Sequence, residues 1–178
     1  AQKEQIYFMP LYLPFASKKQ LDIIVANSKE NLFFMSDFLL FKDYLYAWRY
    51  MGRFEKPDFA SYTYQGFSLQ WLLGKAYKES NQSYFYYAIL MERAIMRMKE
   101  LDVDICLFVD WFENQSYDKS VYYAMHQYYP EAKVHGYMGF IADSTIFPHI
   151  IASNKELFCH IAPKDIYLCS SYLLKFYQ

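Results

Sequence analysis

This chain has few glycines, few cysteines and no long apolar run, and each shortage excludes a class of protein. Five glycines in 178 residues argue against a collagen-like, low-complexity or glycine-loop-rich architecture. The three cysteines, Cys106, Cys159 and Cys169, are an odd set without motif spacing, so we expect a reducing compartment, no disulfide framework and no zinc site. No apolar run reaches the roughly 18 residues that a membrane-spanning helix needs.

Further absences bear on location and partners. The first ten residues lack the basic segment and apolar core of a signal peptide, so we expect a cytoplasmic protein, free or attached to the surface of the inner membrane. The net charge of −1 gives no reason to expect a nucleic-acid partner. The phosphate-binding and nucleophile motifs GxGxxG, GxxxxGK[ST] and GxSxG are all missing.

Aromatic residues, in contrast, are abundant, with 20 tyrosines, 16 phenylalanines and 3 tryptophans. Rings of this kind pack on sugar faces, which suggests a carbohydrate ligand. Packing of amphipathic elements into a core nevertheless accounts for most of them.

The first part of the chain is predicted to be rich in helices. Residues 21–26 (LDIIVA) fit either a short strand or the end of a helix that starts near Ser17. Three helices are predicted between residues 36 and 101: one capped by Ser36, one over 66–79 and one over 83–101. The apolar stripe of the third helix consists of Tyr84, Tyr87, Ala88, Met91, Ala94, Ile95 and Met98.

From residue 102 the pattern changes to alternating strands and helices. Strands are predicted over 104–110, 132–140 and 165–170, with helices between them and a further helix beginning in 172–178. The second of the connecting helices is short, and Ser153 is its predicted cap. The first of these strands is a continuous apolar run that contains Cys106, as expected of a parallel strand covered on both faces. This alternation of strands and helices predicts right-handed βαβ units and therefore a parallel sheet.

We therefore predict an α/β protein with a Rossmann-like parallel sheet of few strands and a helix-rich N-terminal segment. Residues 1–101 form the helical segment packed on the sheet, and 102–178 form the βαβ unit. The two make one compact domain or a fragment of a two-domain enzyme. Sites of open parallel sheets lie outside the carboxyl ends of the strands, here residues 110–115, 137–143 and 170–172.

The segment Asp110-Trp111-Phe112-Glu113-Asn114-Gln115 is the main candidate for such a site. A carboxylate beside aromatic rings suits acid–base chemistry on a hydroxyl, because partial desolvation moves its pKa toward the working range. Glu113 fits that description, and the amides of Asn114 and Gln115 could fix hydroxyl groups. In the alternative interpretation, Asn114 or Ser116 caps the next helix, and both carboxylates lie in solvent near its positive end.

Other polar residues are weaker candidates. Asp118 and Lys119 are expected on a solvated helix face. Glu156 and His160 have i, i+4 spacing, but a surface pair is favoured over a metal site. His126, His135 and His149 are scattered, and are expected to be partly buried hydrogen-bonding residues. Gly136 and Gly139 allow either close approach of a ligand or loop, or a bulge at the end of the strand.

Two of these motifs carry a resemblance to a known family. A strand that ends in Trp-Phe-Glu-Asn-Gln (111–115), followed by Asp118-Lys119 and by a strand ending in Gly-Tyr-Met-Gly (136–139), is similar to bacterial surface-polysaccharide biosynthesis glycosyltransferases. The likeness continues more weakly through 147–170, with Glu156 and Pro163 at matching places, and through the helical region with Trp48 and Trp71. In all it spans residues 36–172.

The resemblance implies a GT-B-like enzyme that moves a sugar from a nucleotide donor to lipopolysaccharide or capsule, usually without a metal. Glu113 would be the acid or base, and Asp110 a second carboxylate or an alternative nucleophile. Trp111, Asn114 and Gln115 would bind substrate, and Tyr137 and Gly139 would line the cleft.

The chain departs from that family in length. Two Rossmann-like domains do not fit in 178 residues. The resemblance then implies the N-terminal, acceptor-side half, which binds a glycan or glycolipid acceptor but no cofactor, and which lacks the domain for the nucleotide sugar. The alternative is a non-catalytic α/β interaction module whose aromatic helices pack on a partner. A third possibility is a small hydrolase that uses Asp110 and Glu113.

Overall fold

The computed structural model describes residues 5–10, 18–50, 58–80, 83–139 and 151–171. Three parallel strands form a sheet in the order β5-β6-β7, and this confirms the predicted α/β fold class. The strands are β5 (Leu107–Trp111), β6 (Lys133–Met138) and β7 (Asp165–Leu168).

The helices precede and connect these strands. The α-helices are α1 (Lys18–Asn27), α2 (Phe41–Tyr50), α3 (Gln70–Ser80), α4 (Ser83–Glu100), α5 (Ser116–Tyr128) and α7 (Asn154–Phe158). Short 3-10 turns occur at η1 (Met35–Asp37) and η2 (Phe59–Ser61). Two further strand pairs are short: β1 (Tyr7–Phe8) with β2 (Asn31–Leu32), parallel, and β3 (Thr63–Tyr64) with β4 (Phe67–Ser68), antiparallel.

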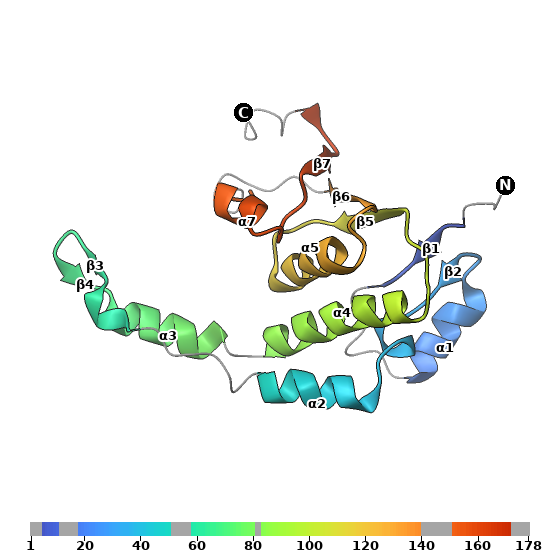
Figure 1. Cartoon of the computed structure of the whole chain (residues 1–178), viewed down its shortest axis with the longest axis horizontal. Coiled ribbons are helices and arrows are strands. Elements are labelled where there is room, and N and C mark those ends of the chain that lie inside the picture. Colours follow the sequence, from blue (N-terminus) through green and yellow to red (C-terminus); the bar gives the residue numbers. More distant parts are fainter. Residues whose placement is uncertain (1–4, 11–17, 51–57, 81–82, 140–150, 172–178) are drawn as a thin grey trace.

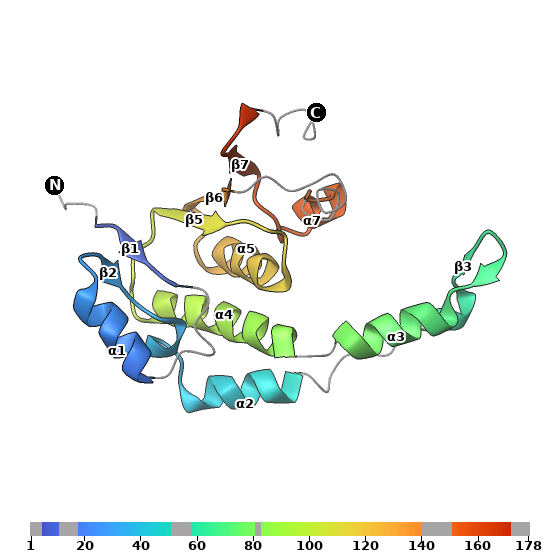
Figure 2. The same ribbon diagram turned by 180° about the vertical axis from the view of Figure 1, so that it is seen from behind.

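The elements are arranged in layers (Figure 1). Helix α5 lies along the sheet, α4 packs on the other side of α5, and α2 lies against α4. Helix α3 and the β3–β4 hairpin project away from these layers, as Figure 2 also shows. In the described part of the chain, no helix is long and apolar enough to cross a lipid bilayer.

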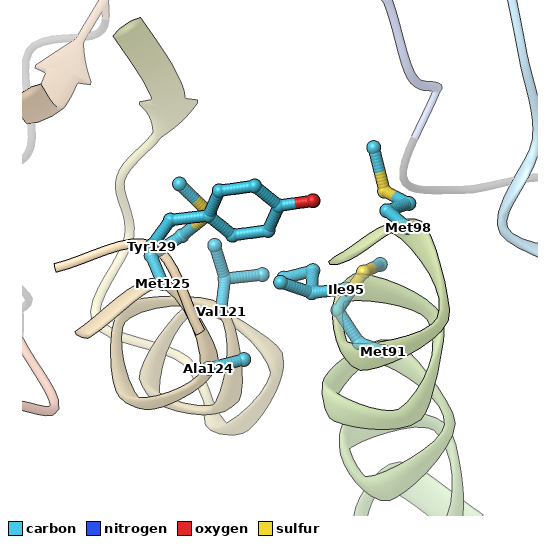
Figure 3. Packing of buried hydrophobic residues seen from close by; sticks show 7 residues of the cluster. All are labelled: Met91, Ile95, Met98, Val121, Ala124, Met125 and Tyr129. Carbon is cyan, nitrogen blue, oxygen red and sulfur yellow. The ribbon is translucent and has the colours of Figure 1, made fainter. Parts of the chain in front are cut away.

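The core forms where α4 meets α5 (Figure 3). Met91, Ile95 and Met98 lie on one face of α4, as the predicted apolar stripe requires. They contact residues of α5 and of its C-terminal end, namely Val121, Ala124, Met125 and Tyr129. Seven such side chains, each 5% exposed or less, make this interface the main apolar contact that holds the layers together.

The predicted elements differ from the structure mainly at their ends. Residues 21–26 belong to helix α1, which settles the alternative left open for them. The helix predicted over 66–79 begins only at Gln70, because Gln65 and Gly66 both have positive φ (49° and 84°) and turn the chain into the β3–β4 hairpin. Ser153 caps α7 as predicted. The helix predicted in 172–178 lies outside the described residues.

The prediction that β5 is covered on both faces is wrong for the described part of the chain. Phe108 and Asp110 face α5, whereas Leu107, Val109 and Trp111 on the opposite face are 51%, 57% and 46% exposed. Cys106, just before the strand, is also exposed rather than buried as a small hydrophobe. An apolar run therefore correctly indicated a parallel strand but not how many of its faces are covered.

A buried ion pair joins α2 to α4. The Asp43 carboxylate is fully buried and accepts hydrogen bonds from Arg97, at 2.8 and 2.9 Å, and from Arg93 at 3.0 Å. Burial acts to raise the pKa of Asp43, but the bonds from Arg97, the Leu40 amide and Arg93 outweigh it and hold this pKa at about 2. Each partner compensates the desolvated charge of the other.

We expect Asp43→Ala to lower the free energy of unfolding by about 3–5 kcal/mol, because Arg97 would stay buried without its carboxylate. Urea unfolding followed by circular dichroism at neutral pH measures this change. Glu79→Ala is the matched control: it breaks the exposed ion pair with Lys75 and should leave the unfolding midpoint nearly unchanged. Equal effects of the two substitutions would contradict a structural role for the buried pair.

Candidate functional site

Two aromatic rings lie side by side at the carboxyl edge of the sheet. Trp111 ends β5 and Tyr137 is its partner on β6, with ring centroids 5.8 Å apart at an interplanar angle of 71°. Both rings are on the uncovered face, 46% and 39% exposed. They form a partly exposed aromatic surface directly before the segment that was predicted to carry the site.

Gly139 fits closely against this aromatic pair. A Cβ atom at this position would lie 2.6 Å from two ring carbons of Trp111 and 2.7 Å from one of Tyr137. Gly136 is similarly enclosed, by Pro163 and Phe112. The close approach predicted for these glycines is therefore made by neighbouring side chains of the chain itself.

Glu113 is held between two donors. The Trp111 indole Nε1 donates to its Oε1 at 2.9 Å, and the Gln115 amide Nε2 donates to its Oε2 at 2.5 Å. Glu113 is half-buried, and its carboxylate is fixed beside the aromatic pair rather than extended into solvent. A carboxylate has about four acceptor sites, so it can still accept a hydrogen bond from a ligand hydroxyl.

Asp118 holds the loop that carries Glu113. Its Oδ2 accepts the backbone N–H groups of Glu113 at 3.0 Å and of Gln115 at 2.8 Å. Asn114, between them, has a φ of 57°, a left-handed conformation that asparagine tolerates well. Gln115, rather than Asn114 or Ser116, is the N-cap of α5.

The prediction that Asp118 lies on a solvated helix face is wrong, because its side chain is fully buried. A carboxylate three residues after the N-cap is the spacing of a capping box, and this signal could have revealed its role. Lys119 is not simply solvated either. Its Nζ lies 2.5 Å from Glu156 Oε1 and connects the first turns of α5 and α7.

Asp110 faces away from the aromatic pair. It is 3% exposed and lies on the α5 side of the sheet, near Asp118 and Tyr122. Burial, and secondarily the Asp118 carboxyl, raise the pKa of Asp110 well above its usual range, and the facing Tyr122 hydroxyl offsets this only in part. Burial likewise raises the pKa of Asp118, despite its bonds from the Gln115 and Glu113 amides.

The raised pKa values of Asp110 and Asp118 favour the protonated form of each carboxyl group at a pH where aspartate is ordinarily ionised. Oδ2 of Asp110 and Oδ1 of Asp118 find no hydrogen-bond partner among the described residues, which fits groups that are costly to ionise. The aspartates form a layer beneath the loop, while Glu113 lies at the surface above it.

A groove runs along the open edge of β5 up to this site. It has a volume of about 900 Å³, lies between β1 and β5, and extends from Val103 to Trp111. Its walls include apolar side chains from β1, such as Phe8, and from the residue after β2, Phe33. The groove gives the site a concave approach on the side away from β6.

The structure brings together five of the seven predicted site residues: Trp111, Glu113, Gln115, Tyr137 and Gly139. Asn114 lies in the same loop, and Asp110 faces the opposite side of the sheet. The predicted rim at 140–143 and 172, and His149, lie outside the described residues. Sequence reasoning missed the supporting roles of Asp118 and Tyr122.

Glu156 is part of a helix cap. Its carboxylate accepts the N–H and hydroxyl of Ser153, each at 2.8 Å, besides pairing with Lys119. Burial acts to raise the pKa of Glu156, but Lys119 and Ser153 outweigh it and lower this pKa to about 2. Within the described ranges, no group of three or more His, Cys, Asp or Glu residues is arranged to hold a metal ion.

We expect Gly139→Ala to destabilise the protein by roughly 1–3 kcal/mol, because the added methyl overlaps the Trp111 and Tyr137 rings. Urea unfolding gives the loss in stability, and the tryptophan emission spectrum reports the displaced indole. Gly74→Ala in α3 is the control, since nothing lies within 4 Å of its added Cβ and alanine favours a helix. A neutral Gly139→Ala with an unchanged spectrum would contradict the close packing.

We expect the wild-type stability to fall as the pH rises from about 4 to about 8, by up to about 1.4 kcal/mol per pH unit for one retained proton. The sign follows from the raised pKa of Asp110: the unfolded chain releases its proton in the ordinary range, whereas the folded chain must keep it. Asp110→Asn should reduce this dependence, most of all at the upper end of the range because the raised pKa of Asp118 still contributes at the lower end, and it should raise stability at alkaline pH.

Urea unfolding over that pH range tests the expectation. Asp102→Asn is the matched control, because Asp102 is an exposed carboxylate with positive φ, a conformation that asparagine also adopts. The control should keep the wild-type pH dependence. The same slope in Asp110→Asn would mean that Asp110 is not the group that retains the proton.

No protein-family model, no curated protein and no solved structure matches this chain. A function for it therefore has to rest on its own residues.

Proposed function

We propose that this chain is the acceptor-side domain of a glycosyltransferase that transfers a sugar from a nucleotide donor to a surface glycan, with Glu113 as the acid or base. One observation carries the proposal. A carboxylate hydrogen-bonded by an indole and an amide lies beside a second aromatic ring, at the carboxyl edge of a parallel sheet. Ligand sites of open α/β sheets are found at that edge.

The chemistry of these groups suits a sugar. The exposed faces of Trp111 and Tyr137 offer apolar surface to the C–H face of a pyranose, while hydroxyls at its rim need hydrogen-bond partners. Gln115 and Glu113 supply these partners within the same few residues. A general base must lie within hydrogen-bond reach of the hydroxyl it deprotonates, and Glu113 keeps acceptor capacity for one.

The groove between β1 and β5 has room for an extended acceptor. Its volume of about 900 Å³ lies within the usual range for ligand sites, and it leads directly to Trp111. In this proposal the growing glycan lies in the groove and presents its terminal hydroxyl to Glu113. Asp110 also belongs to the groove lining but is only 3% exposed, so we assign the proton transfer to Glu113, beside Trp111 at the end of the groove.

The proposal requires a second domain for the nucleotide sugar. A GT-B enzyme holds the donor in its other half, and that half would face the carboxyl edge of this sheet. Trp111 and Tyr137 would then lie at the entrance to a cleft between the domains. Peripheral attachment to the inner membrane would place the domain beside a lipid-linked acceptor.

A non-catalytic interaction module is the second candidate, and one observation favours it. Large side chains on α2, α3 and the β3–β4 hairpin are strongly exposed: Phe41 (77%), Trp48 (69%), Phe67 (75%) and Trp71 (75%). Exposed aromatic residues in such number are typical of surfaces that bind another protein. This function does not require Glu113.

We expect Glu113→Gln in the full-length enzyme to lower sugar transfer by about 100-fold or more, because an amide cannot accept the proton of the acceptor hydroxyl. Transfer from a radiolabelled nucleotide sugar to the surface glycan measures the effect. Circular dichroism and the melting temperature should stay close to wild type, since the amide keeps the shape of the side chain.

Glu131→Gln is the matched control, because Glu131 is an exposed carboxylate before β6 at the other end of the sheet. It should transfer sugar at the wild-type rate. Unchanged transfer in Glu113→Gln would exclude the proposed role and leave the interaction module as the better assignment.

A further inference from the structure

A second cavity lies at the other end of the sheet from Glu113. It has a volume of about 550 Å³ and is lined by the C-terminal half of α5, the start of β6, the turn after α7 and the segment that leads into β7. From Lys133, at its rim, to Tyr137 the chain advances roughly 13 Å along β6. None of the residues assigned to the Glu113 site lines this cavity, although Tyr167, the β7 partner of Tyr137, does.

Basic and imidazole side chains gather in this cavity. Three of the four histidines of the chain line it, from α5 (His126), β6 (His135) and the turn after α7 (His160). Lys133 and Lys164, both exposed, also belong to its lining. Asp165 is the one carboxylate among the lining residues, so the lining carries a net positive charge even with neutral histidines.

His126 and His160 stack on each other. Their ring centroids are 3.7 Å apart, and the ring planes differ by 16°. His160 has a φ of 56° at the end of α7, where the Ile161 N–H bonds back to the Glu156 carbonyl at 3.0 Å. Glycine is the usual residue at such a helix end. The sequence places an imidazole there instead, and its ring completes a wall of the cavity.

His135 adds a ring nitrogen that has no hydrogen-bond partner among the described residues. This nitrogen, Nδ1, is buried, and the nearest carboxylate oxygen, on Asp165, is 3.6 Å away. The ring is otherwise packed edge-on against Tyr167, with centroids 5.1 Å apart. A buried polar atom of this kind is costly unless a ligand or water pairs with it.

We infer that this cavity binds a small phosphomonoester, with the phosphate held by His126, His160 and the two lysines. Imidazole N–H groups and ammonium groups are donors that suit phosphate oxygens. The other lining residues, such as Met125, Leu157 and Tyr129, offer apolar surface to the carbon part of the ligand. The volume matches a small molecule rather than a lone ion.

Two features limit the affinity. Asp165 repels an anion, and the C-terminal end of α5 presents the negative end of its dipole to the cavity. We therefore expect millimolar binding of inorganic phosphate alone, and tighter binding of an ester whose carbon part fills the remaining volume. This site is independent of the proposed sugar transfer.

The test is a titration of the full chain with inorganic phosphate at neutral pH and constant ionic strength, followed by 1H–15N chemical shifts. Saturable shifts are expected at His126, Lys133 and His160. His160→Gly should weaken binding about fivefold, the loss of one hydrogen bond, and keep the fold because glycine suits the positive φ. Lys164→Gln should weaken binding by a similar factor.

Lys155→Gln is the control, since Lys155 is an exposed lysine of α7 outside the cavity lining, and its affinity should equal that of wild type. Non-saturable shifts, or wild-type affinity in both His160→Gly and Lys164→Gln, would overturn the inference. Glucose 6-phosphate, used as the ester probe, should bind more tightly than inorganic phosphate, and equal affinity would overturn the assignment of an ester. Sedimentation with vesicles that contain phosphatidic acid, a lipid phosphomonoester, would instead identify a lipid headgroup as the source of the phosphate if it depends on His160.

Discussion

The packing of α5 between α4 and the sheet is the contact on which the rest of the structure depends. One face of α5 meets Met91, Ile95 and Met98 of α4, and another supports β5 and β6 through Tyr122 and its neighbours. Each end of α5 then borders a candidate site: its first turn fixes the Glu113 loop, and its last turns line the histidine cavity. A shift of this helix would disturb the core and both sites together.

The loop that carries Glu113 is held at a cost in stability. Asp118 must be buried to accept its backbone N–H groups, and Asp110 is buried beside it. Burying two carboxyl groups in one place raises the pKa of both and makes their ionised forms expensive. Such strained polar groups are frequent at functional sites, where precise placement of a side chain matters more than stability. The position of Glu113 therefore depends on groups that are buried beneath its loop.

The sheet has a different character on its two faces. The α5 side is closed by apolar packing, whereas the opposite side exposes Leu107, Val109 and Trp111, and β5 borders a groove. Parallel sheets are generally covered on both faces, so exposed apolar strands imply contact with a ligand or with further protein. The glycan-binding and the interaction hypotheses both account for this exposure, and they differ in whether the Glu113 edge takes part in chemistry.

The sequence by itself determined the α/β class, the apolar stripe of α4, the Ser153 cap and the placement of Trp111 to Gln115 at a strand end, because these follow from local periodicity and spacing. Only the tertiary structure decided that Asp43 pairs with Arg97, 54 residues away. It also decided that Asp118 is buried and that Asp110 lies on the α5 side of the sheet, away from Glu113. It also brought three histidines from separate elements to one cavity. Local pattern specifies which residues share a face, but what covers that face depends on contacts between distant segments, which no short stretch of sequence contains.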